Sequence, residues 1–190
     1  ESVKILSPET ETILPVATAT CPMAEQIAPE RVRKFKEENP NTEVVAYINT
    51  TAALKAECDV CVTSSSAIKI VKKLPSDEIL FIPDQHLGSF VQKSVPEKKF
   101  ILWDGYCPVH AQLTKEDVLK CKAEHPDAVF AVHPESPKEV VELADMVGAT
   151  SEIISYAKAQ KGKVIIGTER GVVDYLAIKI VLHAVYLPFF

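Results

Sequence analysis

Short apolar runs alternate along the chain with longer segments in which apolar and charged residues recur at helical spacing. Apolar runs of this kind are typical of buried strands, and the longer periodic segments are typical of helices. Strands are expected over 13–16, 43–48, 59–63, 79–82, 100–104, 128–133, 144–147 and 164–167. Helices are expected over 29–39, 51–57, 64–73, 85–92, 114–125, 137–143 and 150–160, and 1–6 resembles the end of another helix. Strands that alternate with helices through short loops predict an α/β fold, with parallel sheets covered on both faces.

The pattern also repeats. When the sequence is shifted by 86 residues, Cys21 falls on Cys107, and the 52 positions from Cys21 to Lys72 contain 13 identities without a gap. Composition alone would give about three. We therefore expect repeated three-layer αβα units with short parallel sheets, and such units pack around an approximate symmetry axis. The expected division is a remnant of a first unit at 1–16, a second unit at 17–100, a third unit at 101–176 and an atypical apolar tail at 177–190. The remnant suggests that the chain is a fragment, with roughly 65 residues of the first unit lying upstream.

Composition narrows the class of protein. The chain has 190 residues and a net charge of −5, and its Lys and Arg residues do not cluster, which argues against nucleic-acid binding. No apolar run reaches the ~20 residues needed to span a bilayer, and no signal peptide is recognised. Five cysteines at irregular spacing favour thiols that are free or bound to metal in a reducing cytoplasm, rather than a disulfide framework.

The segment Gly105-Tyr106-Cys107-Pro108-Val109-His110 is the first candidate for chemistry. It follows the predicted strand 100–104 and precedes the predicted helix 114–125. Open α/β sheets keep their ligand sites at the carboxyl ends of their strands. Cys107, with an imidazole three residues later, is therefore a candidate metal ligand or nucleophile; the alternative is a small buried apolar residue.

The repeat singles out further polar positions. Each lies at the end of a predicted strand or just after it: Tyr47 coincides with His133, Asn49 with Glu135, and Ser64 with Thr150. Together these side chains supply the hydrogen-bonding and acid–base groups of a polar pocket. Ser64 and Thr150 also open predicted helices, where backbone N–H groups favour anionic ligands. A capped turn at 133–135 and a simple N-cap at 64–66 are the alternatives.

The other cysteines are predicted to pack. Cys21 has Ala24 where Cys107 has His110, and Cys121 lies in the middle of a helix on an apolar stripe. Cys58-x-x-Cys61 has the spacing of a metal or redox site, but Cys58 ends a helix and Cys61 lies inside a strand.

Several motifs together resemble the quinolinate synthase family. They are Cys21-Pro-Met-Ala, Tyr47-Ile-Asn-Thr, Thr63-Ser-Ser, Ile82-Pro-Asp, Trp103-Asp-Gly-Tyr-Cys-Pro-Val-His110, His133-Pro-Glu, Gly148-Ala-Thr-Ser and Gly167-Thr-Glu. The likeness runs from Glu1 to about Leu176. It implies three homologous α/β domains around a pseudo-threefold axis and a 4Fe–4S cluster held by three cysteines. It also implies a transferase that condenses iminoaspartate with dihydroxyacetone phosphate to quinolinate, with release of phosphate and water, in de novo NAD biosynthesis.

The resemblance assigns roles to the positions that the repeat had selected. Cys107 would be a cluster ligand. The dicarboxylate-binding residues would be Tyr47, Asn49, Ser64, His133, Glu135 and Thr150, of which His133, Glu135 and Tyr47 would also act in acid–base catalysis. The other two ligand cysteines are expected outside this chain, one upstream of Glu1 and one near the carboxyl end of the whole protein. The truncated chain alone is then expected to be inactive. L-aspartate oxidase or aspartate dehydrogenase is the expected working partner.

Two alternatives stay open. The first is a zinc-binding module that uses Cys58 and Cys61 with Cys107 and His110, although the apolar strand around Cys61 argues against it. The second is a metal-free α/β module that binds a small dicarboxylate or phosphate near Ser64 and Thr150. Neither module would be catalytic.

Overall fold

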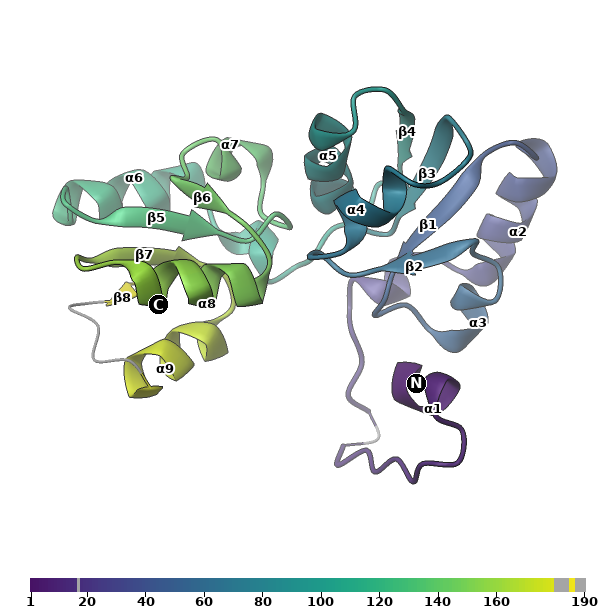
Figure 1. Cartoon of the computed structure of the whole chain (residues 1–190), viewed down its shortest axis with the longest axis horizontal. Coiled ribbons are helices and arrows are strands. Elements are labelled where there is room, and N and C mark those ends of the chain that lie inside the picture. Colours follow the sequence, from purple (N-terminus) through teal and green to yellow (C-terminus); the bar gives the residue numbers. More distant parts are fainter. Residues whose placement is uncertain (17, 180–184, 187–190) are drawn as a thin grey trace. The chain divides into compact units, whose positions relative to one another are not determined.

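The computed structural model describes residues 1–16, 18–179 and 185–186 (Figure 1). Its contacts divide the chain into two compact units, Glu1–Gly105 and Tyr106–Phe190. Each unit has its own sheet and its own core.

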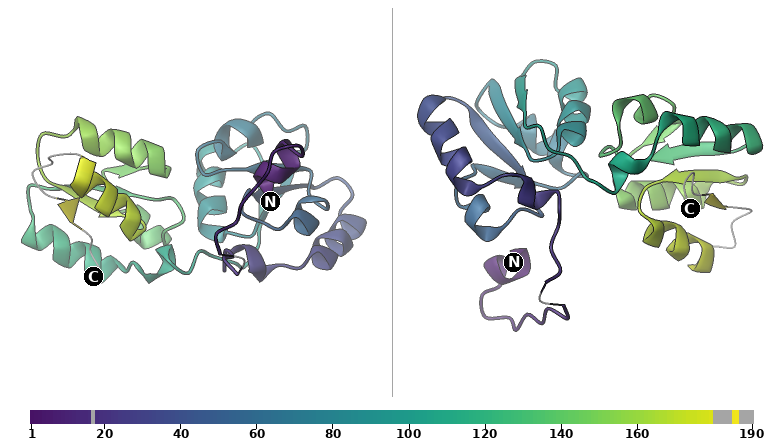
Figure 2. Two further views of the ribbon diagram at one scale, coloured as in Figure 1. Left: turned by 90° about the horizontal axis from the view of Figure 1, so that it is seen from below. Right: turned by 180° about the vertical axis from the view of Figure 1, so that it is seen from behind.

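The first unit carries a parallel sheet of four strands in the order β2-β1-β3-β4. In chain order its elements are α1 (Ser2–Leu6), the 3₁₀ turn η1 (Ala24–Gln26), α2 (Pro29–Glu38), β1 (Glu43–Tyr47), α3 (Ala52–Lys55), β2 (Val60–Val62), α4 (Ala67–Val71), β3 (Glu78–Ile82), α5 (Gln85–Ser94) and β4 (Lys99–Leu102). Helices lie on both faces of this sheet (Figures 1 and 2).

Alternation along the strands builds two cores in the first unit. Val45 and Phe81 face α4 and α5, whereas Val44 and Leu80 face α2 and α3. Successive side chains of a strand point to opposite faces, so two adjacent apolar residues on one strand serve two different helix layers. The unit is therefore a three-layer αβα structure.

The second unit has the same architecture, with strand order β6-β5-β7-β8 and parallel pairing throughout. Its elements are η2 (His110–Gln112), α6 (Lys115–Glu124), β5 (Val129–Val132), α7 (Lys138–Val141), β6 (Met146–Val147), α8 (Thr150–Ala159), β7 (Val164–Gly167), α9 (Arg170–Lys179) and β8 (Val185–Tyr186). Phe130 and Val132 of β5 pack against α6 and α7, while Ala131 packs against α8 and α9.

The internal repeat predicts this correspondence between the two units. Adding 86 to the bounds of α2 gives 115–124, the bounds of α6, and adding 86 to those of α3 gives 138–141, the bounds of α7. The predicted α/β class with short parallel sheets is thus confirmed. The pseudo-threefold axis and the four-part division into 1–16, 17–100, 101–176 and 177–190 stay predictions.

Local signals fix several helix starts. Thr114 and Asp117 form the expected capping box at the start of α6, because the Thr114 hydroxyl accepts from the Asp117 N–H at 3.1 Å and Asp117 accepts from the Thr114 N–H at 3.2 Å. Asp84 caps α5 by accepting from the Leu87 N–H at 2.7 Å.

Two predicted elements and the predicted tail differ most from the structure. The strand expected over 13–16 is wrong: Ile13 and Leu14 are exposed and the segment is irregular, and Pro15 has no N–H to give to a sheet. The helix expected over 64–73 begins only at Ala67, because the backbone N–H groups of Thr63 and Ser66 donate to each other's hydroxyls at 2.9 and 3.2 Å and form a turn. The predicted atypical tail at 177–190 begins inside α9, and 180–184 and 187–190 lie outside the described residues.

Among the residues that the structure describes, no helix has the length and apolar character needed to cross a bilayer.

Candidate metal and substrate site

In the second unit, polar side chains gather at the carboxyl ends of β5 and β7. His133 and Glu135 follow β5, and Thr168 follows β7. The two strands pair in parallel, and the His133 N–H donates to the Gly167 carbonyl at 3.0 Å, so their ends lie side by side. Cys107 and His110 come from the segment that leads into η2 and α6.

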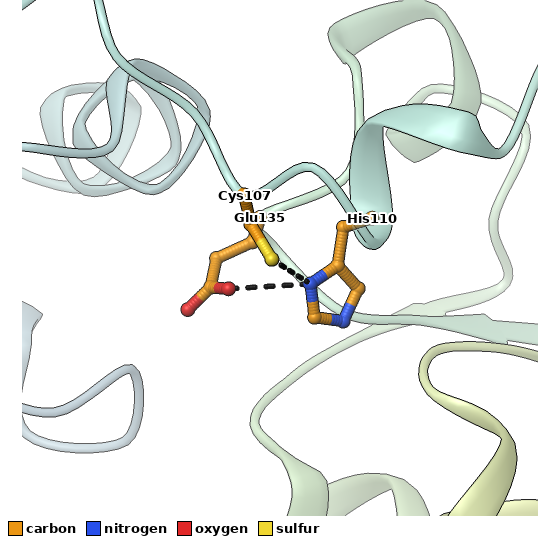
Figure 3. A group of neighbouring side chains, drawn as sticks. All are labelled: Cys107, His110 and Glu135. Atoms are coloured by element: carbon orange, nitrogen blue, oxygen red, sulfur yellow. Dashed lines mark hydrogen bonds and ion pairs between the residues drawn. The ribbon is translucent and has the colours of Figure 1, made fainter. Parts of the chain in front are cut away.

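Cys107, His110 and Glu135 converge on one point (Figure 3). The His110 Nδ1 lies 3.3 Å from the Cys107 Sγ and 3.2 Å from a Glu135 carboxylate oxygen. One ligand atom from each of the three residues lies within 4.8 Å of the others. In the described part of the chain, this is the group of His, Cys, Asp and Glu side chains that could hold a metal ion.

His133 completes the group from the other side of His110. The two imidazole rings stack, with centroids 4.6 Å apart and an interplanar angle of 18°. The His133 Nδ1 accepts from the backbone N–H of Glu135 at 3.3 Å. A neutral His133 must therefore carry its proton on Nε2.

The first unit places a matching set of residues at the end of β1. A pocket of about 420 Å³ is lined there by Cys21, Asn49 and Lys55, among others. The Asn49 side-chain amide lies 3.9 Å from the Cys21 Sγ. Cys21 thus lines a pocket beside Asn49 and does not pack in the core, so the prediction that it is a packing residue is wrong.

The family model described as Quinolinate synthetase A protein matches residues 1–189. The chain belongs to this family. The family membership that the sequence motifs predicted is confirmed.

Curated relatives of this family are similar over most of the chain. The quinolinate synthase of Caldicellulosiruptor saccharolyticus is 54% identical over 173 residues, which is 90% of this chain and 57% of that protein. That of Aquifex aeolicus is 51% identical over 172 residues (90% and 53%), and that of Alkaliphilus metalliredigens is 49% identical over 177 residues (93% and 58%). The chain therefore spans little more than half the length of these relatives.

The structure places each predicted substrate-binding residue at the end of a strand or just after it. Tyr47 ends β1 and is half-buried against the α4 and α5 core, and Asn49, two residues later, is exposed. Ser64 follows β2, which pairs with β1, and Thr150 follows β6, which pairs with β5. Their roles as substrate-binding or catalytic residues stay predictions.

The expectation that Ser64 and Thr150 open helices holds only for Thr150. Thr150 is the first residue of α8, where Glu152 already accepts from the Ala149 N–H at 2.7 Å. Ser64 lies in the turn that precedes α4, a helix of only five residues.

Three other cysteines pack as expected. Cys58 and Cys61 are half-buried against the core formed with α2 and α3, and the Cys58 thiol donates to the Leu54 carbonyl at 3.0 Å. Burial raises the pKa of the Cys58 thiol to about 12 and that of Cys61 in the same direction. Metal ligation needs the thiolate, so these values disfavour the zinc alternative. Cys121 is buried in the core under α6.

His110 was expected beside Cys107 and as a ligand in the zinc alternative, but it was not among the predicted substrate-binding or catalytic residues, and Thr168 had no predicted role. The repeat holds a signal for both. Ala24 and Ile82 occupy the equivalent positions of the first unit, so two apolar positions of one copy are polar in the other.

The pKa values of the two stacked histidines are shifted in opposite directions. Burial opposes protonation of His110, but its hydrogen bonds to Cys107 and Glu135, together with the negative charge of both, raise its pKa to about 9. Burial lowers the pKa of His133 to about 4; the charge of Glu135 opposes this shift and that of His110 adds to it.

In the metal-free chain we therefore expect His110 to be charged and His133 neutral at pH 7. Because its pKa is raised, His110 stabilises the folded chain; this stabilisation is fully present below pH 6.5 and is lost as the pH rises through 9. Because its pKa is lowered, neutral His133 stabilises the folded chain; this stabilisation is present above pH 6.5 and is lost as the pH falls through 4. NMR titration of the ring nitrogens measures both values, and two histidines that titrate together near 6.5 would contradict the geometry.

Two buried hydroxyls sit at equivalent positions beside these sites. Within the described part of the chain, the side-chain oxygens of Thr50 and Ser136 have no hydrogen-bond partner. Each residue ends a turn in which its backbone N–H donates to the carbonyl three residues earlier, that of Tyr47 for Thr50 and that of His133 for Ser136.

Since an unpartnered buried hydroxyl costs stability, Ser136→Ala is expected to raise the free energy of unfolding by about 1 kcal/mol. Urea denaturation measures it. The control is Ser155→Ala, whose exposed hydroxyl donates to the Ser151 carbonyl at 2.9 Å and whose loss brings no such gain. A clear loss of stability in Ser136→Ala would mean that an ordered water satisfies the hydroxyl.

Proposed function

We propose that this chain is part of a quinolinate synthase. The enzyme would condense iminoaspartate with dihydroxyacetone phosphate to quinolinate, with release of phosphate and water, as a transferase of de novo NAD biosynthesis. The observation that carries the proposal is the convergence of Cys107, His110 and Glu135 in a chain of the quinolinate synthetase A family. Because the chain spans about half the length of its relatives, the activity is proposed for the whole protein.

The proposed cofactor is a 4Fe–4S cluster. Its irons are held by cysteine thiolates, and Cys107 offers a half-buried sulfur beside two further polar groups rather than inside an apolar core. Cys21 has the same place in the first unit, beside Asn49, so we propose it as a second ligand. This departs from the expectation that both remaining ligands lie outside the chain; a third would still come from there. When bound, a cluster with an open iron supplies a Lewis acid.

The chain's own residues would bind the dicarboxylate and move protons. Asn49, Ser64 and Thr150 offer uncharged hydrogen-bond donors for carboxylate oxygens. Glu135 is a buried carboxylate that can accept a proton, and His133 presents an Nε2–H. Formation of the ring requires removal of protons from carbon and nitrogen and loss of water, which are acid–base steps. Tyr47 is proposed as a further donor.

Iminoaspartate is an imine that water hydrolyses. An L-aspartate oxidase or an aspartate dehydrogenase that supplies it is therefore the proposed working partner.

The test uses a version of the chain extended at both ends to the full gene. After anaerobic reconstitution with iron and sulfide, we expect about four irons per chain, visible absorption and quinolinate formation from the two substrates. Cys107→Ala and Cys21→Ala should each lose the cluster and the product. Cys121→Ala is the matched control and should keep the cluster, since the Cys121 thiol is buried in a core of the unit that carries Cys107.

The outcomes separate the alternatives. If Cys21→Ala keeps its iron, the second ligand lies outside the chain. Zinc binding without visible absorption would favour the zinc module. Binding of dicarboxylate or phosphate without any metal would favour the metal-free module.

A further inference from the structure

His110 is held from both of its ring nitrogens. On one side, Nδ1 faces the Cys107 sulfur at 3.3 Å and the Glu135 carboxylate at 3.2 Å. On the other side, Nε2 lies 2.9 Å from the hydroxyl oxygen of Thr168. Thr168 is 2% exposed and His110 9%, so water does not compete freely for these contacts. The ring orientation is therefore set by the protein.

The first unit shows that the fold does not need this polar pair. Its equivalent positions are Ala24 and Ile82, both buried. In the first unit these two positions are thus buried with apolar side chains. Replacing a buried hydrogen-bonded pair by apolar groups is often neutral or stabilising. The second unit therefore carries the pair beside Cys107 for a reason other than packing.

The chemistry of a hydroxyl explains the choice of threonine. Since a carboxylate only accepts, the His110 nitrogen that faces Glu135 must carry a hydrogen. When the ring is neutral, Nε2 then has a lone pair and the Thr168 hydroxyl donates to it. When the ring is protonated, Nε2–H donates and the same hydroxyl accepts. Thr168 can therefore keep the Nδ1–H pointed at Cys107 and Glu135 in both charge states.

We propose that Thr168 is a positioning residue that fixes His110 with its Nδ1–H directed at the Cys107 sulfur. In the proposed enzyme the Cys107 thiolate would receive an N–H···S hydrogen bond, and this part rests on the proposed function. Groups that hydrogen-bond to a metal ligand fix its geometry and tune the metal. Hydrogen bonds to the sulfurs also help to set the reduction potential of a cluster.

The first test uses the metal-free chain and does not depend on the proposed function. Nitrogen-15 NMR of the His110 ring, at a pH where the ring is neutral, reports which nitrogen carries the hydrogen. We expect an Nδ1–H ring in the wild type and in Thr168→Ser, which keeps the hydroxyl. In Thr168→Val, which keeps the shape, a substantial Nε2–H population should appear. Thr42→Val removes another buried threonine hydroxyl, in the first unit, and should leave the His110 ring unchanged.

The second test uses the extended protein loaded with iron. Thr168→Val is expected to lower the reduction potential and to release iron about 10-fold faster than the wild type, with Thr168→Ser close to the wild type. If the wild type takes up no iron, the proposed function fails while the NMR result still decides the role of Thr168. Thr168→Ala replaces the valine variant if that variant does not fold. An unchanged Nδ1–H ring in the variants without the hydroxyl would overturn the proposal.

Discussion

Replacing Glu135 by glutamine in the extended protein is expected to lower turnover about 10²–10⁴-fold while the iron content stays unchanged. The side chain is 4% exposed, and glutamine keeps its size. The amide oxygen can still accept from the His110 Nδ1–H, which lies 3.2 Å from the carboxylate. The amide cannot take up a proton, however, so the variant removes the acid–base function and leaves the shape of the site. Quinolinate formation and iron content are measured on the same samples.

Glu139→Gln is the matched control for this variant. Glu139 lies exposed on α7 of the same unit, and its loss should change neither turnover nor iron content. A parallel loss of iron and turnover in Glu135→Gln would identify Glu135 as a metal ligand, which its place in the Cys107 and His110 group also permits. Unchanged turnover would remove Glu135 from the mechanism.

Most of the fold could be predicted because short apolar runs and capped polar segments alternate so regularly. Strand β7 was predicted with its observed bounds, and Thr114 and Asp117 marked the start of α6. The segment 13–16 shows the limit of this reasoning. An apolar run becomes a strand only when another strand pairs with it, and the sequence pattern alone does not identify that partner. Helix α9 was missed, although Val172 and Leu176 pack on β7 at helical spacing.

The site could be predicted as far as the repeat reached. It selected His133 and Glu135, because both copies carry polar residues where these strands end, with Tyr47 and Asn49 in the first unit. The contact between His110 and Thr168 could not be predicted from local pattern. The two residues are 58 positions apart and meet only because the chain segment before α6 lies at the end of β7.

Replacing Phe130 by alanine is expected to lower the free energy of unfolding of the second unit by ~3–5 kcal/mol. The ring is fully buried in the core between the sheet and α6 and α7. Its loss removes the transfer free energy of a large apolar side chain and leaves a cavity. A domain of this size has only ~5–15 kcal/mol of stability, so much of it would be lost. Urea denaturation followed by the amide NMR signals of β5 and β7 measures the change.

The effect should extend to the site, because the Phe130 ring lies directly against Gly167. A Cβ placed on Gly167 would lie 2.8 Å from a ring carbon, so only glycine fits at the end of β7, one residue before Thr168. Without the ring, the end of β7 loses its support, and the NMR signals of His110 and Thr168 should broaden or shift. Leu119→Ala on α6 is the control: this side chain is 46% exposed, and its loss should cost less than ~0.5 kcal/mol. If Phe130→Ala and Leu119→Ala lower the free energy of unfolding by the same amount, Phe130 does not anchor this core, and other contacts must support Thr168.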